Sequence, residues 1–183
     1  MDLRMVKTRQ QIKKAFLSLR EKFMPEDIKV KDICDEAMIN KTTFYNHYTD
    51  SIALSDEIDN GVIDSVISSF LEWNKIFDDP KTYAKNLLLA LEKNADDIKK
   101  VFRGKQGVLC SKLEERLFNL YGGMAKTGED GVFMSFAIGG FVQLGKDYLF
   151  SNHKYSLDEI SEYSAKMMEA LIHQKTLFSQ NII

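Results

Sequence analysis

The segment that most constrains the fold is residues 30–51, where two short helical patterns are separated by only a few residues. The first pattern repeats apolar side chains at helical spacing, on Val30, Ile33, Cys34 and Ala37. The second begins after Asn40, a residue type that favours the N-cap position of a helix. Two short helices joined this tightly predict a helix-turn-helix unit.

The second of these helices carries polar side chains where a buried helix would carry apolar ones. Phe44 and Tyr48 share one helical face and are expected to point into a three-helix core. The remaining side chains face outwards and are Lys41, Thr42, Thr43, Tyr45 and Asn46. A helix with such a face fits the major groove of DNA, where the base edges display distinguishable donors and acceptors.

The chemistry of these side chains predicts which of them contact bases. Thr42 and Thr43 can hydrogen-bond bases or touch a thymine methyl group, and Asn46 can pair with an adenine edge. Lys41 suits a guanine or a phosphate. The side chains expected to contact the DNA backbone, which sets register without carrying sequence information, are Tyr45, His47, Lys31, Lys7, Thr8 and Arg9.

Charge is distributed unevenly along the chain. The net charge is −2, which argues against indiscriminate coating of DNA. Residues 1–24 nevertheless contain seven Lys or Arg residues and only two acidic ones, so the acidic excess lies in the remainder. A basic first helix beside the polar helix supports a surface that faces an anion. A plain three-helix bundle with a solvated basic helix is the alternative.

Helical periodicity continues through the rest of the chain, and no segment has a convincing strand pattern. Asp79-Pro80 and Ser156-x-x-Glu159 are helix-start signals. The further helices are expected over residues 51–77, 80–91, 98–103, 108–121, 130–150 and from 157 towards the C-terminus. We therefore predict an all-α protein with a helix-turn-helix domain at residues 1–50 and a larger helical domain at residues 51–183.

The N-terminal quarter strongly resembles the TetR family of one-component transcription regulators. The likeness covers roughly Val6 to Leu54, and spacing and residue type agree over that whole stretch. Its motifs are Ile12-x-x-Ala15-Phe16-x-x-Leu19, Val30-x-Asp32-Ile33-x-x-x-Ala37, Lys41-Thr42-Thr43-Phe44-Tyr45-x-His47-Tyr48 and Asp50-x-x-x-Leu54. The resemblance implies a homodimer that binds a pseudo-palindromic operator, represses transcription and is released by a small-molecule inducer.

In that family the C-terminal body dimerises, and its last two helices pair with those of a second copy. The segment 130–150 is apolar around much of its circumference, which favours an interface, although packing within one subunit is the alternative. The residues expected at the dimer interface are Phe133, Phe136, Gly140, Phe141, Leu144, Met167 and Leu171.

The resemblance also implies a ligand pocket among the aromatic side chains of the middle helices. The expected lining residues are Phe70, Trp73, Phe77, Tyr83, Phe102, Cys110, Phe118 and Tyr121. An aromatic stripe that is simply part of the core is the alternative, and no paired charges identify a ligand.

Two positions depart from the family pattern. Met38 stands in the turn where the family usually has Gly, which tolerates a positive φ more cheaply. Ser51 stands where the family commonly has a phosphate-contacting Lys. Both changes predict weakened DNA binding. They also allow a second interpretation, in which the protein is a TetR-like coactivator that works through a protein partner.

Other functional classes find little support in the sequence. The histidines are scattered, no phosphate-cradling glycine loop or nucleophile motif is present, and we expect no enzymatic activity, metal or cofactor. Cys34 and Cys110 have no motif spacing and are expected to be reduced core thiols. Without a long apolar run or a signal-peptide pattern, a cytoplasmic location is expected.

Overall fold

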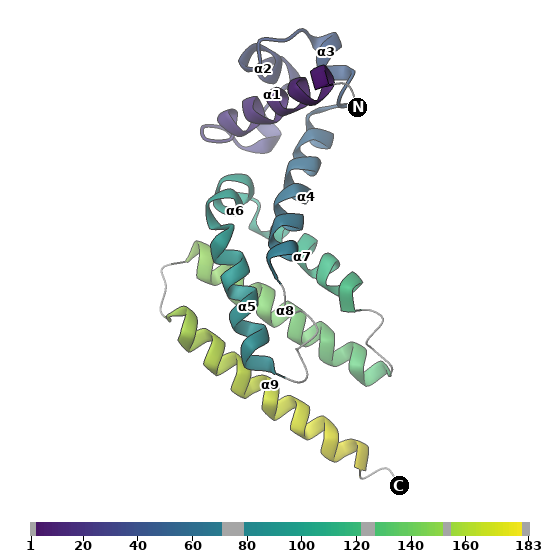
Figure 1. Ribbon diagram of the computed structural model, residues 1–183, viewed down its shortest axis with the longest axis vertical. Coiled ribbons are helices and arrows are strands. Elements are labelled where there is room, and N and C mark those ends of the chain that lie inside the picture. Colours follow the sequence, from purple (N-terminus) through teal and green to yellow (C-terminus); the bar gives the residue numbers. More distant parts are fainter. Residues whose placement is uncertain (1–2, 71–78, 122–126, 152–154, 181–183) are drawn as a thin grey trace. The chain divides into compact units, whose positions relative to one another are not determined.

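The computed structural model describes residues 3–70, 79–121, 127–151 and 155–180, with side chains up to His173 (Figure 1). These residues form helices and turns and contain no strand, which confirms the all-α fold class. The helices are α1 (Leu3–Leu19), a 3₁₀ turn η1 (Pro25–Asp27), α2 (Val30–Glu36), α3 (Lys41–Tyr45), α4 (Ser51–Ser69), α5 (Pro80–Lys93), α6 (Ala95–Phe102), α7 (Gln106–Tyr121), α8 (Gly128–Phe150) and α9 (Leu157–Gln180). In the described part of the chain, every helix is too short or too polar to cross a lipid bilayer.

Contacts along the chain divide it into two compact units. The head unit comprises Met1–Asp64 and Asp96–Gln106, and the body unit comprises Ser65–Ala95 and Gly107–Ile183. The head unit therefore contains the first part of α4 and most of α6 in addition to α1, α2 and α3. The sequence predicts a division into two functional domains at residue 50. That division differs from these structural units and stays a prediction.

The head unit is built on the apolar faces that the sequence pattern indicates. Ile12, Ile33, Phe44 and Leu54 are completely buried, and α1 packs on α2, which packs on α3. Asn40 caps α3 as expected, because its side-chain oxygen accepts a hydrogen bond from the backbone N–H of Thr43 at 2.7 Å. Burial of these apolar side chains, each contributing about 1.5–3 kcal/mol, stabilises α2 and α3, which are too short to be stable alone.

The turn between α2 and α3 has the strained backbone that its sequence suggests. Met38 has a φ of 52°, in the left-handed region where a β-carbon costs about 1–2 kcal/mol. Its side chain is 85% exposed, so burial does not offset that cost. The turn is closed by the backbone N–H of Ile39, which donates to the carbonyl of Cys34 at 3.0 Å.

A buried arginine attaches α6 to the end of α1. Arg20 is only 2% exposed, and its guanidinium donates to the backbone carbonyls of Phe23 and Arg103, both at 2.7 Å, and Val101 at 3.3 Å. Two of these carbonyls lie at the C-terminal end of α6, where the helix dipole favours a cation. Burial lowers the pKa of Arg20. α6 ends at Phe102, and Gly104 adopts the left-handed φ of 78° that suits glycine after a helix.

A buried ion pair attaches the residues after α6 to α4. The Lys105 ammonium lies 2.6 Å and 2.8 Å from the two carboxylate oxygens of Asp59. The two side chains are only 14% and 3% exposed. Lys105 also donates to the Ser55 hydroxyl at 3.2 Å, which helps to compensate for the lost hydration of its charge.

The body unit is built on α5, α8 and α9. α5 packs against both α8 and α9, and these two also pack on each other. The predicted start signals are confirmed: Asp79 caps α5, with Pro80 as its first residue, and Ser156 and Glu159 form the capping box of α9. The prediction that the fourth helix runs to about Phe77 is wrong in that α4 ends at Ser69, before the non-helical Phe70. Residues 71–78 lie outside the described part of the chain.

The buried ion pair in the head unit gives a first prediction. Lys105→Met leaves the Asp59 carboxylate buried without its main cation and should destabilise the protein by about 3–5 kcal/mol. Lys100→Met removes an exposed, solvent-screened pair with Glu21 and should destabilise the protein far less. Urea unfolding followed by circular dichroism measures both. Equal effects of the two substitutions would contradict the assignment of Lys105–Asp59 as the structural pair.

Candidate nucleic-acid interface

The two faces of α3 differ in the way that the sequence predicts. Phe44 is completely buried and Tyr48 is 5% exposed, so both act as the expected core anchors. Their rings lie 5.9 Å apart. The side chains of Lys41, Thr42, Tyr45 and Asn46 are exposed, whereas Thr43 is half-buried. Most of the side chains predicted to face DNA therefore share a polar outer surface, which Thr43 joins only in part.

The segment predicted to contact DNA bases, Lys41 to Asn46, is called the reading segment. Its helix is shorter than the sequence pattern suggests. α3 has five residues and ends at Tyr45, while Asn46 occupies its C-cap and His47 follows in a turn, half-buried. The reason lies in the next helix, since the Asp50 carboxylate caps α4 by accepting from the backbone N–H of Ala53 at 2.8 Å. The chain must turn between these two helices. Ser51, at the start of α4, is half-buried.

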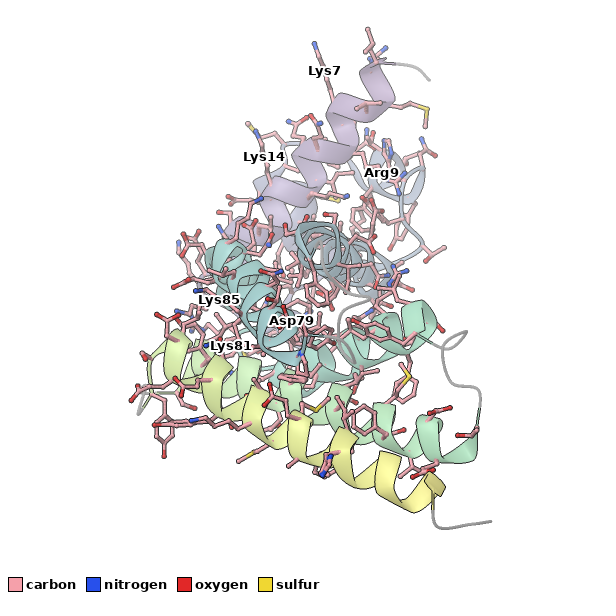
Figure 2. All side chains as sticks on the ribbon, turned by 60° about the horizontal axis from the view of Figure 1, so that its bottom comes forward. Lys7, Arg9, Lys14, Asp79, Lys81 and Lys85 are labelled. Atoms are coloured by element: carbon pink, nitrogen blue, oxygen red, sulfur yellow. The ribbon has the colours of Figure 1, made fainter. Side chains whose placement is uncertain are left out.

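The cations predicted to hold the DNA backbone have different environments. Lys7 on α1 and Lys31 on α2 are exposed. Figure 2 shows Lys7 and Lys14 projecting from one side of α1 and Arg9 leaving on the other. The hydroxyl of Thr8 donates to the carbonyl of Arg4 in the same helix at 3.0 Å, so it already has one partner.

Arg9 is held by other side chains of the head unit. Its Nε donates to Glu57 Oε1 at 3.2 Å and to the Tyr48 hydroxyl at 3.3 Å, and its Nη2 donates to Glu57 Oε2. The guanidinium carbon also lies 5.4 Å from the centre of the Tyr48 ring. The hydrogen bonds that Arg9 donates to Glu57 and Tyr48 raise its pKa, and its charge is paired with the Glu57 carboxylate within the protein.

Glu57 is the residue of this site that sequence reasoning misses. Lys13 donates to the same carboxylate at 2.6 Å. Although partial burial opposes ionisation, the hydrogen bonds from Arg9 and Lys13 lower the pKa of Glu57 to about 2. Burial of Tyr48 beside this group raises the pKa of the phenol to about 12. No local motif signals the contact, because Arg9 and Glu57 are 48 residues apart in the chain.

The residues predicted to line a ligand pocket do not form one group. In the body unit, the Tyr83 ring lies 5.1 Å from Phe70, 5.2 Å from Phe141 and 6.2 Å from Tyr121. Burial raises the pKa of Tyr83 to about 12. Cys110 is half-buried and Phe118 is 39% exposed, so neither lies fully in this cluster. Phe102 belongs to the head unit, and Trp73 and Phe77 lie outside the described residues.

The outer surface of α8 and α9 is unusually apolar. α9 buries Ser161, Ser164, Ala165 and Met168, yet it exposes Tyr163, Met167 and Leu171. Met167 is 69% exposed and Phe136 on α8 is 68% exposed. Between the helices runs a shallow groove of about 80 Å³, lined by Phe136, Ala137, Gly140, Phe141, Leu144, Ser164, Met167, Met168 and Leu171.

Most residues predicted at a dimer interface meet at this groove. Phe136, Gly140, Leu144, Met167 and Leu171 line it and are exposed. Phe141 also borders it but is 4% exposed, because it packs inward against Tyr83, and Phe133 is half-buried. An apolar stripe that α9 turns outward, while it buries serines, is typical of a surface that another protein covers.

Comparison with known proteins assigns neither a family nor a function to the chain. No protein-family model matches the chain. A search of curated proteins also finds no match.

The ion pairs of Glu57 predict a pH dependence of stability. The pKa of this carboxyl falls from 4.5 to about 2 on folding, so its contribution is present above about pH 4.5 and is lost as the pH falls towards 2. After allowance for solvent screening, we expect Glu57→Gln to cost about 1 kcal/mol at pH 7. The difference between the wild type and the variant should shrink steadily below pH 4.5.

Urea unfolding at pH 7, 4 and 3 measures this difference. Glu21→Gln is the control, because its carboxylate pairs with Lys100 but is 61% exposed, so a smaller change is expected. A difference between wild type and Glu57→Gln that stays constant over this range would contradict the prediction.

Proposed function

We propose that this chain is a homodimeric, sequence-specific DNA-binding regulator of transcription of the TetR type. The observation that carries the proposal is the division of α3 and the following turn. Phe44 and Tyr48 are buried, while the side chains of Thr42 and Asn46 remain exposed. Such a segment can offer hydrogen-bonding groups to base edges while its apolar side fixes their direction.

The surrounding side chains fit this role. Lys41 and Tyr45 are exposed at the two ends of α3, and Lys7 and Lys31 are exposed on the helices nearby in sequence. Their amines and hydroxyl can contact phosphates and set the position of α3 on the duplex. The half-buried Thr43 and His47 are expected to contribute less than Thr42 and Asn46.

Dimerisation follows from the small size of the reading segment. One short helix reads only a few base pairs, so high affinity needs two half-sites about one turn of DNA apart. The exposed apolar surface of α8 and α9 supports a two-fold interface with a second copy. An operator with inverted-repeat symmetry is the expected target.

Within this proposal the protein is a repressor that occupies its operator until a small molecule binds the body. The inducer must bind one conformation more tightly than the other, because equal affinity shifts no equilibrium. The aromatic cluster around Tyr83 is where the family resemblance leads us to expect that ligand. The proposed cytoplasmic location follows from a chromosomal DNA target.

A second candidate function is that of a coactivator acting through a protein partner. It is favoured by the apolar side chains that the head unit exposes, since Met38 is 85%, Ile52 71% and Tyr45 55% exposed. Apolar groups of this kind are more typical of protein contacts than of phosphate contacts. A stoichiometric protein partner, together with no retention on any duplex, would favour this function over operator binding.

Selection of random duplex DNA by the purified protein tests the main proposal. We expect an enriched inverted repeat. Asn46→Ala and Thr42→Ala should each weaken binding to it by about 5- to 150-fold, or about 1–3 kcal/mol, and relax the preferred base. Failure to enrich any repeat, or full affinity in both variants, would contradict the reading segment proposed here.

Lys7 gives a separate prediction about the DNA backbone. Lys7→Ala should weaken binding to every sequence and reduce the slope of log K against log[salt] by about 0.9, because one phosphate contact is lost. Lys81→Ala is the charge-matched control, as Lys81 is an exposed lysine at the start of α5 in the body unit (Figure 2). Fluorescence anisotropy at several KCl concentrations measures both. Equal slopes of log K against log[salt] for the two variants would show that Lys7 does not contact the DNA.

The dimer interface is tested by placing charges on the apolar surface. Phe136→Glu and Met167→Glu should each convert the dimer to a monomer in analytical ultracentrifugation, because two copies of the new carboxylate meet at a two-fold interface. Phe118→Glu is the control, since Phe118 is an exposed aromatic residue on α7. A dimer that persists in both variants would place the interface elsewhere.

A further inference from the structure

The cations of α1 lie on two sides of the helix. Lys7 and Lys14 are exposed and project together from one side (Figure 2), because they are two helical turns apart. Arg9 and Lys13 are one turn apart and both contact Glu57 on α4. The basic helix of the sequence therefore offers fewer available cations than its composition suggests.

Glu57 uses both of its carboxylate oxygens in these contacts. Oε1 accepts from Arg9 Nε at 3.2 Å and from Lys13 Nζ at 2.6 Å, while Oε2 accepts from Arg9 Nη2. Arginine binds phosphate groups in the same bidentate geometry. The Arg9 and Lys13 side chains are 51% and 35% exposed, so a phosphate can reach them but must compete with the carboxylate.

We propose that Glu57 occupies the phosphate-binding positions of Arg9 and Lys13 and thereby weakens sequence-independent binding of this protein to DNA. This inference rests on the proposed DNA-binding function and assigns a specificity-determining role to a residue of α4. The carboxylate acts as an internal substitute for a DNA phosphate. Its hydrogen bonds leave the base-contacting groups of α3 untouched.

The proposal depends on how proteins bind DNA without sequence preference. Binding to DNA of any sequence depends almost entirely on the number of phosphates that basic side chains neutralise, because each contact releases counterions. The single Glu57 carboxylate cancels one of the two positive charges of Arg9 and Lys13 and occupies donors of both, so it weakens up to two such contacts. Since a genome contains very many competing non-specific sites, weaker binding to them leaves more protein free to find an operator.

A charge-matched pair of variants tests the proposal on a 24-base-pair duplex of random sequence. Both Glu57→Gln and Glu21→Gln remove one negative charge and break an ion pair of the head unit. Glu21 lies beyond the C-terminal end of α1, whose last residue is roughly 15 Å along the helix from Arg9, and it pairs with Lys100. Fluorescence anisotropy at 50–200 mM KCl gives the affinity and its salt dependence.

Glu57→Gln should bind the random duplex about 5- to 20-fold more tightly than wild type at 50 mM KCl, with a salt slope steeper by about 1–2. Glu21→Gln should change neither quantity. Adding Arg9→Gln and Lys13→Gln to Glu57→Gln should abolish the gain, which shows that these two cations carry it. A carboxylate with a merely structural role would make Glu57→Gln bind more weakly, and that result would overturn the proposal.

A further measurement keeps this test separate from the proposed function. Retention on heparin, a polyanion without base edges, should increase for Glu57→Gln relative to Glu21→Gln even if no protein binds duplex DNA. In that case the proposed function fails and the role of Glu57 in masking the two cations stands. Equal retention of the two variants overturns that role.

The wild-type protein gives an independent readout that needs no variant. The Nε–H resonance of Arg9 should keep its chemical shift when random duplex is added, because the guanidinium stays bonded to Glu57. The Lys7 side-chain signal should shift in the same titration. A shift of the Arg9 resonance that tracks the first additions of duplex would contradict the proposal.

Discussion

The burial of Phe44 is the interaction on which the proposed reading surface depends. α3 has only five residues, and a helix of that length is unstable in water without tertiary contacts. Phe44, completely buried, and Tyr48 fix its rotation about its own axis, while the Asn40 cap fixes its start. With these contacts in place, the side chains on the rest of the helix surface remain exposed to solvent, namely those of Lys41, Thr42, Tyr45 and Asn46.

The head unit also incorporates a segment that lies far away in the chain. The residues at the end of α6 are held by the buried Arg20 and by the Lys105–Asp59 pair. These are charged groups with several hydrogen bonds each, so their geometry is more exacting than that of apolar packing. The segment is covalently continuous with α5 and α7 of the body unit and non-covalently joined to α1 and α4.

Two surfaces of the protein combine polarity and burial in unusual ways. α9 buries Ser161 and Ser164 beside Ala165 and Met168, yet it turns Met167 and Leu171 outward, where a surface helix of a monomer normally carries polar residues. On α1, Arg9 and Lys13 share the Glu57 carboxylate, whereas Lys7 on the opposite side remains exposed. The first surface favours a protein partner, and the second limits which cations are available to a nucleic acid.

The amino-acid sequence by itself determined which segments are helical, several of the helix caps and the inward side of α3, because these depend on residues within one or two turns of each other. Asn40, Asp79 and the Ser156–Glu159 pair all cap the helices that they predict. Only the tertiary structure decided that Glu57 holds Arg9, that Lys105 pairs with Asp59 46 residues away, and that Phe102 belongs to the head unit. Helical periodicity identifies which side chains share a face but not what covers that face, since the covering residues come from distant parts of the chain.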